Sequence, residues 1–158
     1  MEAKPCLALQ TQLDVYMQTN SIQDRLGIRV RVTEQATDGR RPHRVKAELD
    51  AVLTLLCRIP SYARVFIATD SDYIQQTLLS HFIDSRFLPK KFDQRESTGG
   101  YVHRTDKEAM FTFLKEVCCL CACRKVINIG GFLNDGTIRS KIIEAPYDEA
   151  AFLHVRRV

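Results

Sequence analysis

The alternation of hydrophobic and polar positions divides the chain into segments of helical and extended period. Apolar residues recur every three or four positions over about 7–19, 45–59, 73–82 and 107–119, which predicts helices there. Short runs rich in β-branched residues predict strands over about 26–32, 64–69 and 125–129, with a shorter strand at 87–88. The pattern of residues 138–144 fits either a short helix or a final strand.

Helices of about a dozen residues alternate with these strands along the chain. That order predicts an α/β fold with an open, mainly parallel sheet and helices on both faces. Ligands of such sheets bind beyond the carboxyl ends of the strands. The rule places a site near residues 31–34, 70–71 and 130–132, where polar segments follow predicted strands.

Composition narrows the class of protein without naming a partner. The 158 residues are 45% hydrophobic and 27% charged, which is typical of a single globular domain over residues 1–158. The net charge of +4 suits an anionic small molecule as well as nucleic acid, and we expect no specific nucleic-acid partner.

No stretch has the roughly 18 apolar residues of a membrane span, and the N-terminal residues lack a signal-peptide core. We therefore expect a cytoplasmic protein.

Four of the six cysteines lie close together, at Cys118, Cys119, Cys121 and Cys123. Zinc sites usually hold one ligand pair of this spacing and a second pair elsewhere in the chain. Adjacent residues on a helix point about 100° apart, so Cys118 and Cys119 cannot easily share one ion. We expect reduced, buried thiols at a helix end and no bound metal.

Two arginines alternate near the end of the first predicted strand. Arg29 and Arg31 therefore project from the same face of that strand. Two planar, permanently charged guanidinium groups on one face can clamp a diphosphate. The alternative is an edge strand with solvent-facing arginines.

Three further positions are candidates for ligand contacts. Asp70 and Ser71 end a buried strand, so Asp70 could accept hydrogen bonds from a ribose or from guanine, although either residue could instead cap the following helix. Gly130 and Gly131 follow a strand, where backbone N–H groups can approach an anion closely, without the pattern of a P-loop. His103 lies in a polar loop and is a candidate ligand contact rather than a general base.

These motifs, taken in order, resemble the C-terminal, donor-binding half of the α-1,6-fucosyltransferase family over about residues 20–146. The family strand G-V-H-x-R-R-T-D corresponds to residues 27–34 here, and the family strand V-F-x-A-T-D corresponds to residues 65–70. A family G-x-H loop, long helix and apolar strand follow in the same order, at residues 100–103, 107–119 and 126–131. The match to V-F-x-A-T-D is the most specific of the three.

The resemblance implies a Rossmann-like half of a GT-B-type glycosyltransferase that binds a GDP-sugar donor such as GDP-fucose. Arg31 holds the position of the family arginine that binds the donor β-phosphate and matters most for catalysis. Asp70 holds the position of the aspartate that contacts the guanosine. The family uses its donor without a metal ion, so we expect no cofactor and no metal, with arginines neutralising the diphosphate.

The chain departs from the family at three positions of the first strand. Arg29, Val32 and Glu34 stand where the family has His, a second Arg and Asp. The family enzymes also have a second Rossmann-like half that contributes to acceptor binding, for which 158 residues leave no room. Fucosyltransferase-like activity would therefore need a missing or partner acceptor half, so the chain could be a fragment, a stand-alone donor-binding module, one part of a two-chain enzyme or a degenerate relative. A non-catalytic nucleotide- or anion-binding module, or a protein-interaction domain of the same fold, remains open.

Overall fold

A computed structural model describes residues 7–31, 42–92, 107–132 and 138–145 of the chain. These parts contain α-helices, one short 3-10 helix and the strands of a single sheet. The helices are α1 (Leu7–Thr19), η1 (Ile22–Asp24), α3 (Pro42–Leu56), α4 (Asp72–His81) and α5 (Lys107–Ala122). The strands are β1 (Leu26–Val30), β2 (Val65–Thr69), β3 (Ser85–Phe87), β4 (Lys125–Phe132) and β5 (Ile138–Glu144).

The sheet has the strand order β3-β2-β1-β4-β5. Strand β1 pairs in parallel with β2 and β4, and β2 pairs in parallel with β3, whereas β5 runs antiparallel to β4. The prediction of an open, mainly parallel sheet is therefore confirmed. Strand β1 lies in the middle with a partner on each side, so the alternative of an edge strand with solvent-facing arginines is wrong.

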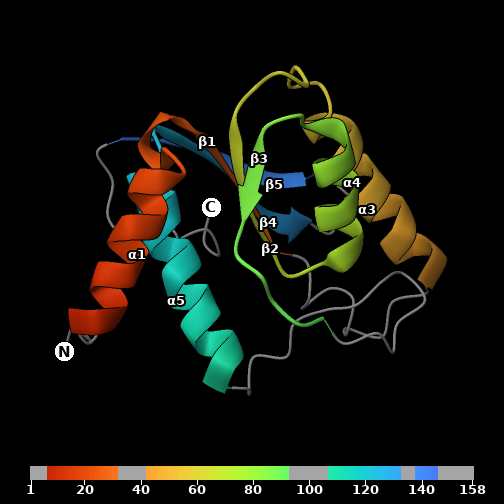
Figure 1. The fold of residues 1–158 in the computed structure, drawn as a ribbon. Helices are drawn as coiled ribbons and strands as arrows, with labels where there is room; N and C mark the ends of the chain where they lie inside the picture. Colours follow the sequence, from red (N-terminus) through yellow and green to blue (C-terminus); the bar gives the residue numbers. More distant parts are fainter. Residues whose placement is uncertain (1–6, 32–41, 93–106, 133–137, 146–158) are drawn as a thin grey trace.

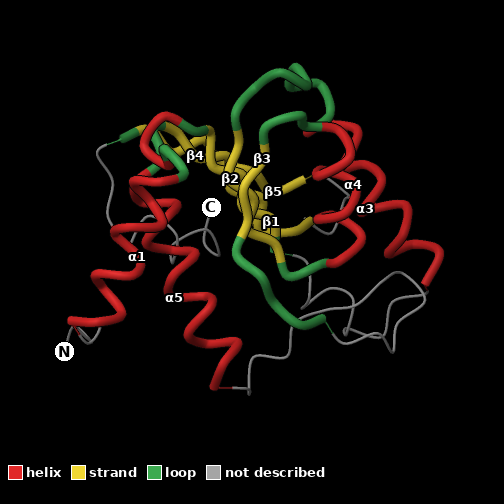
Figure 2. Tube along the Cα trace, in the orientation of Figure 1, coloured by secondary structure: helices red, strands yellow, loops and turns green. Residues whose placement is uncertain are grey.

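Helices cover both faces of the sheet, as predicted (Figures 1 and 2). Helices α1 and α5 lie on one side, and α3 and α4 lie on the other (Figure 1). Alternate residues of β1 face the helices on opposite sides of the sheet. Ile28 and Val30 pack with α3 and α4, while Gly27 contacts α5. Among the described residues, no helix is long and apolar enough to cross a membrane.

One helix and two strands have boundaries that differ from the predicted ones. The helix predicted over 45–59 is α3, which begins at Pro42 and ends at Leu56. Proline suits the first helical position because its missing N–H needs no partner there. The strand predicted over 26–32 ends at Val30. The short strand predicted at 87–88 lies at Ser85–Phe87.

The carboxyl-terminal part of the sheet corrects the prediction for the glycine pair. We expected a strand over 125–129 with Gly130 and Gly131 in the loop after it, but β4 continues to Phe132 and includes both glycines. They lie within the strand because residues 138–144, left open between helix and strand, form β5 beside it. Ile129 pairs with Ser140 and Phe132 with Ile138, so a bulge places both glycines opposite Arg139.

A buried arginine ties the amino-terminal ends of the strands together. Arg25 is fully buried, and its guanidinium donates to Asp84 Oδ1 at 3.0 Å and to the carbonyl oxygens of Asn20, Val65 and Asp84 at 2.8–3.3 Å. Asp84 also accepts from Arg64. Because these partners flank β1, β2 and β3, the network joins these strands at the end of the sheet opposite their carboxyl ends.

Gly27 allows α5 to approach the centre of the sheet. A Cβ at this position would lie 2.9 Å from Val126 Cγ2, 3.0 Å from Leu120 Cδ2 and 3.3 Å from Cys123 Sγ. These distances are shorter than ordinary carbon contacts, so a side chain at residue 27 would push α5 or β4 away. The glycine thus sets the distance between α5 and β1, on which the site described below depends.

We predict that Gly27→Ala lowers the free energy of unfolding by about 1–3 kcal/mol, the usual cost of overpacking a well-packed core. Urea denaturation monitored by circular dichroism measures the change. Gly27→Ala in a Val126→Ala background should cost less than in the wild type, because the nearest methyl group is gone. Equal costs in the two backgrounds would contradict a steric role for Gly27.

Candidate functional site

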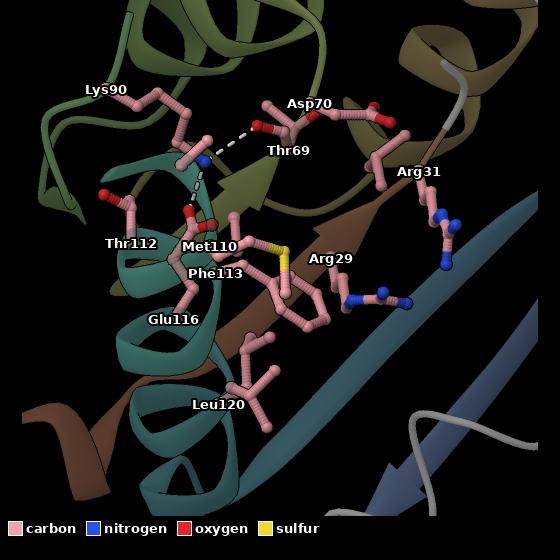
Figure 3. A pocket seen from close by; sticks show the side chains of 14 residues that line it. Arg29, Arg31, Thr69, Asp70, Lys90, Met110, Thr112, Phe113, Glu116 and Leu120 are labelled. Atoms are coloured by element: carbon pink, nitrogen blue, oxygen red, sulfur yellow. Dashed lines mark hydrogen bonds and ion pairs between the residues drawn. The ribbon is translucent and has the colours of Figure 1, made fainter. Parts of the chain in front are cut away.

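A pocket opens at the carboxyl ends of β1 and β2, with α5 as its opposite wall (Figure 3). Its volume is about 160 Å³. Charged groups come from the two strands, from the segment after β3 and from α5, while α5 also supplies most of the apolar surface. The lining residues are Arg29, Val30, Arg31, Ala68, Thr69, Asp70, Lys90, Ala109, Met110, Thr112, Phe113, Glu116, Val117 and Leu120.

Arg29 is a buried cation held between β4 and α5. Its Nη1 donates to Asn128 Oδ1 at 3.0 Å, and its Cζ lies 5.9 Å from the centre of the Phe113 ring. Burial lowers the pKa of Arg29, the neighbouring Arg31 lowers it further, and Asp70 opposes both. An arginine stays charged under such conditions, so the site keeps a cation that water screens poorly.

Arg31 follows the last residue of β1 and lines the same pocket. Its backbone N–H donates to Ile129 O at 2.9 Å, which continues the pairing with β4 beyond Val30. Figure 3 shows the side chains of Arg29 and Arg31 leaving β1 in the same direction, toward β4. The structure therefore brings the two predicted arginines together on one face of a central strand.

Asp70 and Ser71 have different structural roles. Ser71 is the N-cap of α4: its buried Oγ accepts from Ile74 N at 3.4 Å, and its own N–H donates to Thr69 Oγ1 at 3.2 Å. Asp70 lies one residue earlier, with its N–H donating to Val30 O at 3.4 Å, and it lines the pocket with Arg31. The capping role thus belongs to Ser71, which is not among the residues lining the pocket, and Asp70 belongs to the pocket.

The remaining predicted site residues do not join this pocket. Gly130 and Gly131 lie in β4, beside the end of β1, and are not among the described residues that line the pocket. His103 lies outside the described residues. The pocket as described therefore contains Arg29, Arg31 and Asp70 of the predicted set.

The structure adds an ion pair that sequence reasoning missed. Lys90 Nζ donates to Thr69 O at 2.9 Å and to a carboxylate oxygen of Glu116, and both side chains are less than a tenth exposed. Burial raises the pKa of Glu116, and the Lys90 ammonium offsets part of that rise. One signal was present: Phe113, Glu116 and Leu120 share the helical face that packs on the sheet, where a carboxylate needs a partner.

The pocket combines surplus positive charge with an apolar wall. Three cationic side chains face two carboxylates, and Lys90 is already paired with Glu116. The two guanidinium groups suit planar or tetrahedral oxyanions, because each offers several N–H donors in fixed directions. Met110 and Phe113 offer an apolar surface on α5 beside them. Such a site suits a ligand with an anionic group and a flat or apolar part.

Cysteines in α5 and directly after it take part in packing. Cys119 and Cys123 are buried, and Cys123 Sγ donates to Cys119 O at 3.3 Å. Burial raises the pKa of each of these two thiols to about 12, so neither is a thiolate at neutral pH. In the described parts of the chain, no group of three or more His, Cys, Asp and Glu residues is arranged to hold a metal ion.

We predict that Lys90→Met destabilises the fold by about 3–5 kcal/mol at neutral to alkaline pH, because it leaves the buried Glu116 carboxylate without its cation. The loss should shrink in acid. Without Lys90 the pKa of Glu116 in the folded state lies further above its ordinary value of 4.5. Between these two pKa values the folded state binds more protons than the unfolded state, so the free energy of unfolding falls as pH rises.

Denaturant titrations of Lys90→Met at acid and alkaline pH measure this dependence. The double variant Lys90→Met/Glu116→Gln is the matched control, since it removes the titrating carboxyl. It should recover part of the lost stability and lose the pH-dependent difference from the wild type. A Lys90→Met variant whose loss is the same at every pH would contradict a buried, lysine-dependent carboxylate.

No protein-family model and no curated protein sequence matches the chain. Solved structures that resemble it include NodZ α-1,6-fucosyltransferase soaked with GDP-fucose, with a TM-score of 0.49 and 14% identity over 90% of this chain and 50% of that one. NodZ co-crystallized with GDP has a TM-score of 0.48 and 17% identity, over 89% and 48% of the two chains. Fucosyltransferase NodZ from Bradyrhizobium has a TM-score of 0.47 and 15% identity, over 89% and 49%. The chain spans about half the length of these proteins.

Proposed function

We propose that the chain is the donor-binding domain of a fucosyltransferase-like glycosyltransferase, which takes a GDP-sugar of the GDP-fucose type without a metal ion. The observation that carries this proposal is the meeting of Arg31 and Asp70 in one pocket. The two residues lie 39 positions apart in the chain and correspond to the donor contacts of the family motifs. Because β1 and β2 are neighbouring parallel strands, the residues at their carboxyl ends meet at one edge of the sheet, where both can contact a single ligand.

The arginines fit the diphosphate of such a donor. Arg29 is held in place by Asn128 and Phe113, so its guanidinium is oriented before a ligand arrives. Arg31 extends from the end of the same strand into the same pocket. When the sugar–oxygen bond breaks, negative charge grows on the leaving β-phosphate, and a preoriented cation stabilises that charge. We assign this catalytic role to Arg31 and a supporting role in binding to Arg29.

The nucleoside fits the other side of the pocket. The Asp70 carboxylate can accept hydrogen bonds from ribose hydroxyl groups or from the N–H groups of guanine. The pocket volume of about 160 Å³ is below the roughly 300–1,000 Å³ typical of sites for drug-sized ligands. The described pocket therefore accommodates part of a nucleotide sugar, and the rest would extend over the neighbouring surface. Transfer to an acceptor would need an acceptor-binding half in addition to the residues described here, from the same protein or from a partner chain.

We predict that Arg31→Ala weakens GDP binding by ~1.5–3 kcal/mol, the usual contribution of a hydrogen bond to a charged group. The stability of the fold should change little, because Arg31 is partly exposed and follows the last residue of its strand. Isothermal titration calorimetry measures the affinity and a thermal melt measures stability. Arg124→Ala removes an exposed arginine elsewhere and serves as the control.

We predict a different effect for Asp70→Asn, because its proposed partner is the nucleoside. This variant should weaken GDP binding and leave the binding of inorganic pyrophosphate unchanged. Asp24→Asn, an exposed aspartate in η1, is the matched control. If Asp70→Asn unfolds the domain without a change in affinity, Asp70 belongs to the scaffold. If the wild type binds neither GDP nor GDP-fucose at millimolar concentration, the proposed donor site is wrong for this chain.

A further inference from the structure

Strand β5 adds a cation to the sheet face from which Arg29 projects. Asn128 on β4 pairs with Arg29 on β1 and with Lys141 on β5. Residues directly opposite each other on neighbouring strands project from the same face of a sheet. The side in question is that of α1 and α5, because the next pair along, Val126 and Ile143, packs in the core on that side. Arg29, Asn128 and Lys141 therefore form a row across three strands.

A second row lies nearer the carboxyl end of β4. Arg31 follows β1, and its N–H donates to Ile129 O. The bulge in β4 then sets Gly130 and Gly131 opposite Arg139 of β5. Since alternate residues of a strand share a face, Arg139 projects on the same side as Lys141. Two glycines carry no side chains, so β4 offers only backbone between the two arginines of this row.

The β5 cations have no counter-charge on this face among the described residues of β4 and β5. The carboxylate that the described parts of these strands supply is Glu144, which is paired with Lys125 at 3.2 Å. Lys125 projects from the other face, because it alternates with Val126. Like charges gathered in this way repel one another and attract anions.

Buried donors on the same face also lack acceptors within the described part of the chain. Asn128 is fully buried, and its Oδ1 faces Arg29, so its Nδ2 is the donor that points elsewhere; this Nδ2 has no hydrogen-bond partner there. Arg139 Nε is likewise buried and has no partner there. A buried donor without an acceptor costs free energy, which a ligand oxygen would recover.

The cations of β1 and β5 are spread more widely across the sheet than the size of one anionic group. Neighbouring strands lie about 4.8 Å apart, so β1 and β5 are separated by about 10 Å across β4. Arg29 and Arg31 lie on one side of that span and line the pocket, whereas Arg139 and Lys141 lie on the other side and do not. The β5 cations can therefore bind a group different from the one that the pocket holds.

We propose that Arg139 and Lys141, with Asn128 between them and β1, form a second anion subsite that takes the carboxylate or sulfate group of an acidic saccharide. This proposal rests on the proposed donor function, because the saccharide would be the acceptor that lies beside the bound GDP-sugar. It specifies a class of acceptor: a sugar that carries a negative charge. Carboxylate and sulfate share the oxyanion chemistry that guanidinium and ammonium groups bind.

Calorimetric titration of the full chain with four probes tests the subsite: GDP, a sulfated disaccharide, a uronic-acid disaccharide and the neutral disaccharide of the same linkage. The double variant Arg139→Gln/Lys141→Gln should lose about tenfold or more in affinity for one or both acidic disaccharides, and keep its affinity for GDP within about twofold. The charge-preserving variant Arg139→Lys/Lys141→Arg should retain most of the binding. Lys46→Gln/Arg58→Gln, which removes two exposed cations elsewhere, should bind like the wild type.

The outcomes separate the two proposals. Acidic disaccharides that bind no better than the neutral one, or that bind Arg139→Gln/Lys141→Gln as well as the wild type, overturn the subsite. If the binding of acidic disaccharides is lost in Arg31→Ala but kept in Arg139→Gln/Lys141→Gln, the anion lies in the pocket, and the subsite is again overturned. Acidic binding that depends on β5 in a chain that does not bind GDP supports the subsite and refutes the donor function. A single-stranded RNA that binds through Arg139 and Lys141 more tightly than either disaccharide refutes an acidic-saccharide site.

Discussion

The site depends on one physical constraint: a guanidinium group is buried on the central strand of a sheet. Arg29 cannot be solvated as a surface arginine is, so the surrounding elements must orient and compensate it. Asn128 on β4 accepts one of its hydrogen bonds, and the Phe113 ring of α5 lies beside it. The contact with Phe113 requires α5 to lie close to the sheet, which Gly27 permits two residues earlier on the same strand. The position of α5 against β1 and the orientation of the Arg29 guanidinium therefore depend on each other.

A buried ion pair decides which charges in the pocket remain uncompensated. Lys90 and Glu116 largely neutralise each other on the β2 side of the pocket, and Lys90 also ties the chain after β3 to the end of β2. The arginines of β1 remain as the surplus charge, with Asp70 facing them from the end of β2. The protein therefore holds cations in a fixed arrangement before a ligand arrives, which is the condition under which charged groups stabilise an oxyanion most effectively.

Sequence reasoning succeeded where the signal was local. The alternation of Arg29 and Arg31 on one strand, and the position of Asp70 at the end of another, could be predicted from short segments and from the geometry of parallel sheets. The capping role of Ser71 rather than Asp70 could not, because both residues suit a helix N-terminus and only the backbone conformation decides between them. The pairing of Lys90 with Glu116 could not be predicted either, since the two residues lie 26 positions apart in the chain. The placement of the glycines failed because β4 is prolonged by a strand, β5, whose own pattern fitted a helix equally well.

The measurement that tests the central claim most directly is a backbone amide NMR titration of the full chain with GDP. If the pocket at the carboxyl ends of β1 and β2 is the donor site, the largest shifts should occur at Arg29–Arg31 and Thr69–Asp70, and at the face of α5 that carries Phe113 and Glu116. Residues at the opposite end of the strands, around Arg25 and Asp84, should shift little. Saturable shifts centred away from the pocket, or no shifts at millimolar GDP, would contradict the claim.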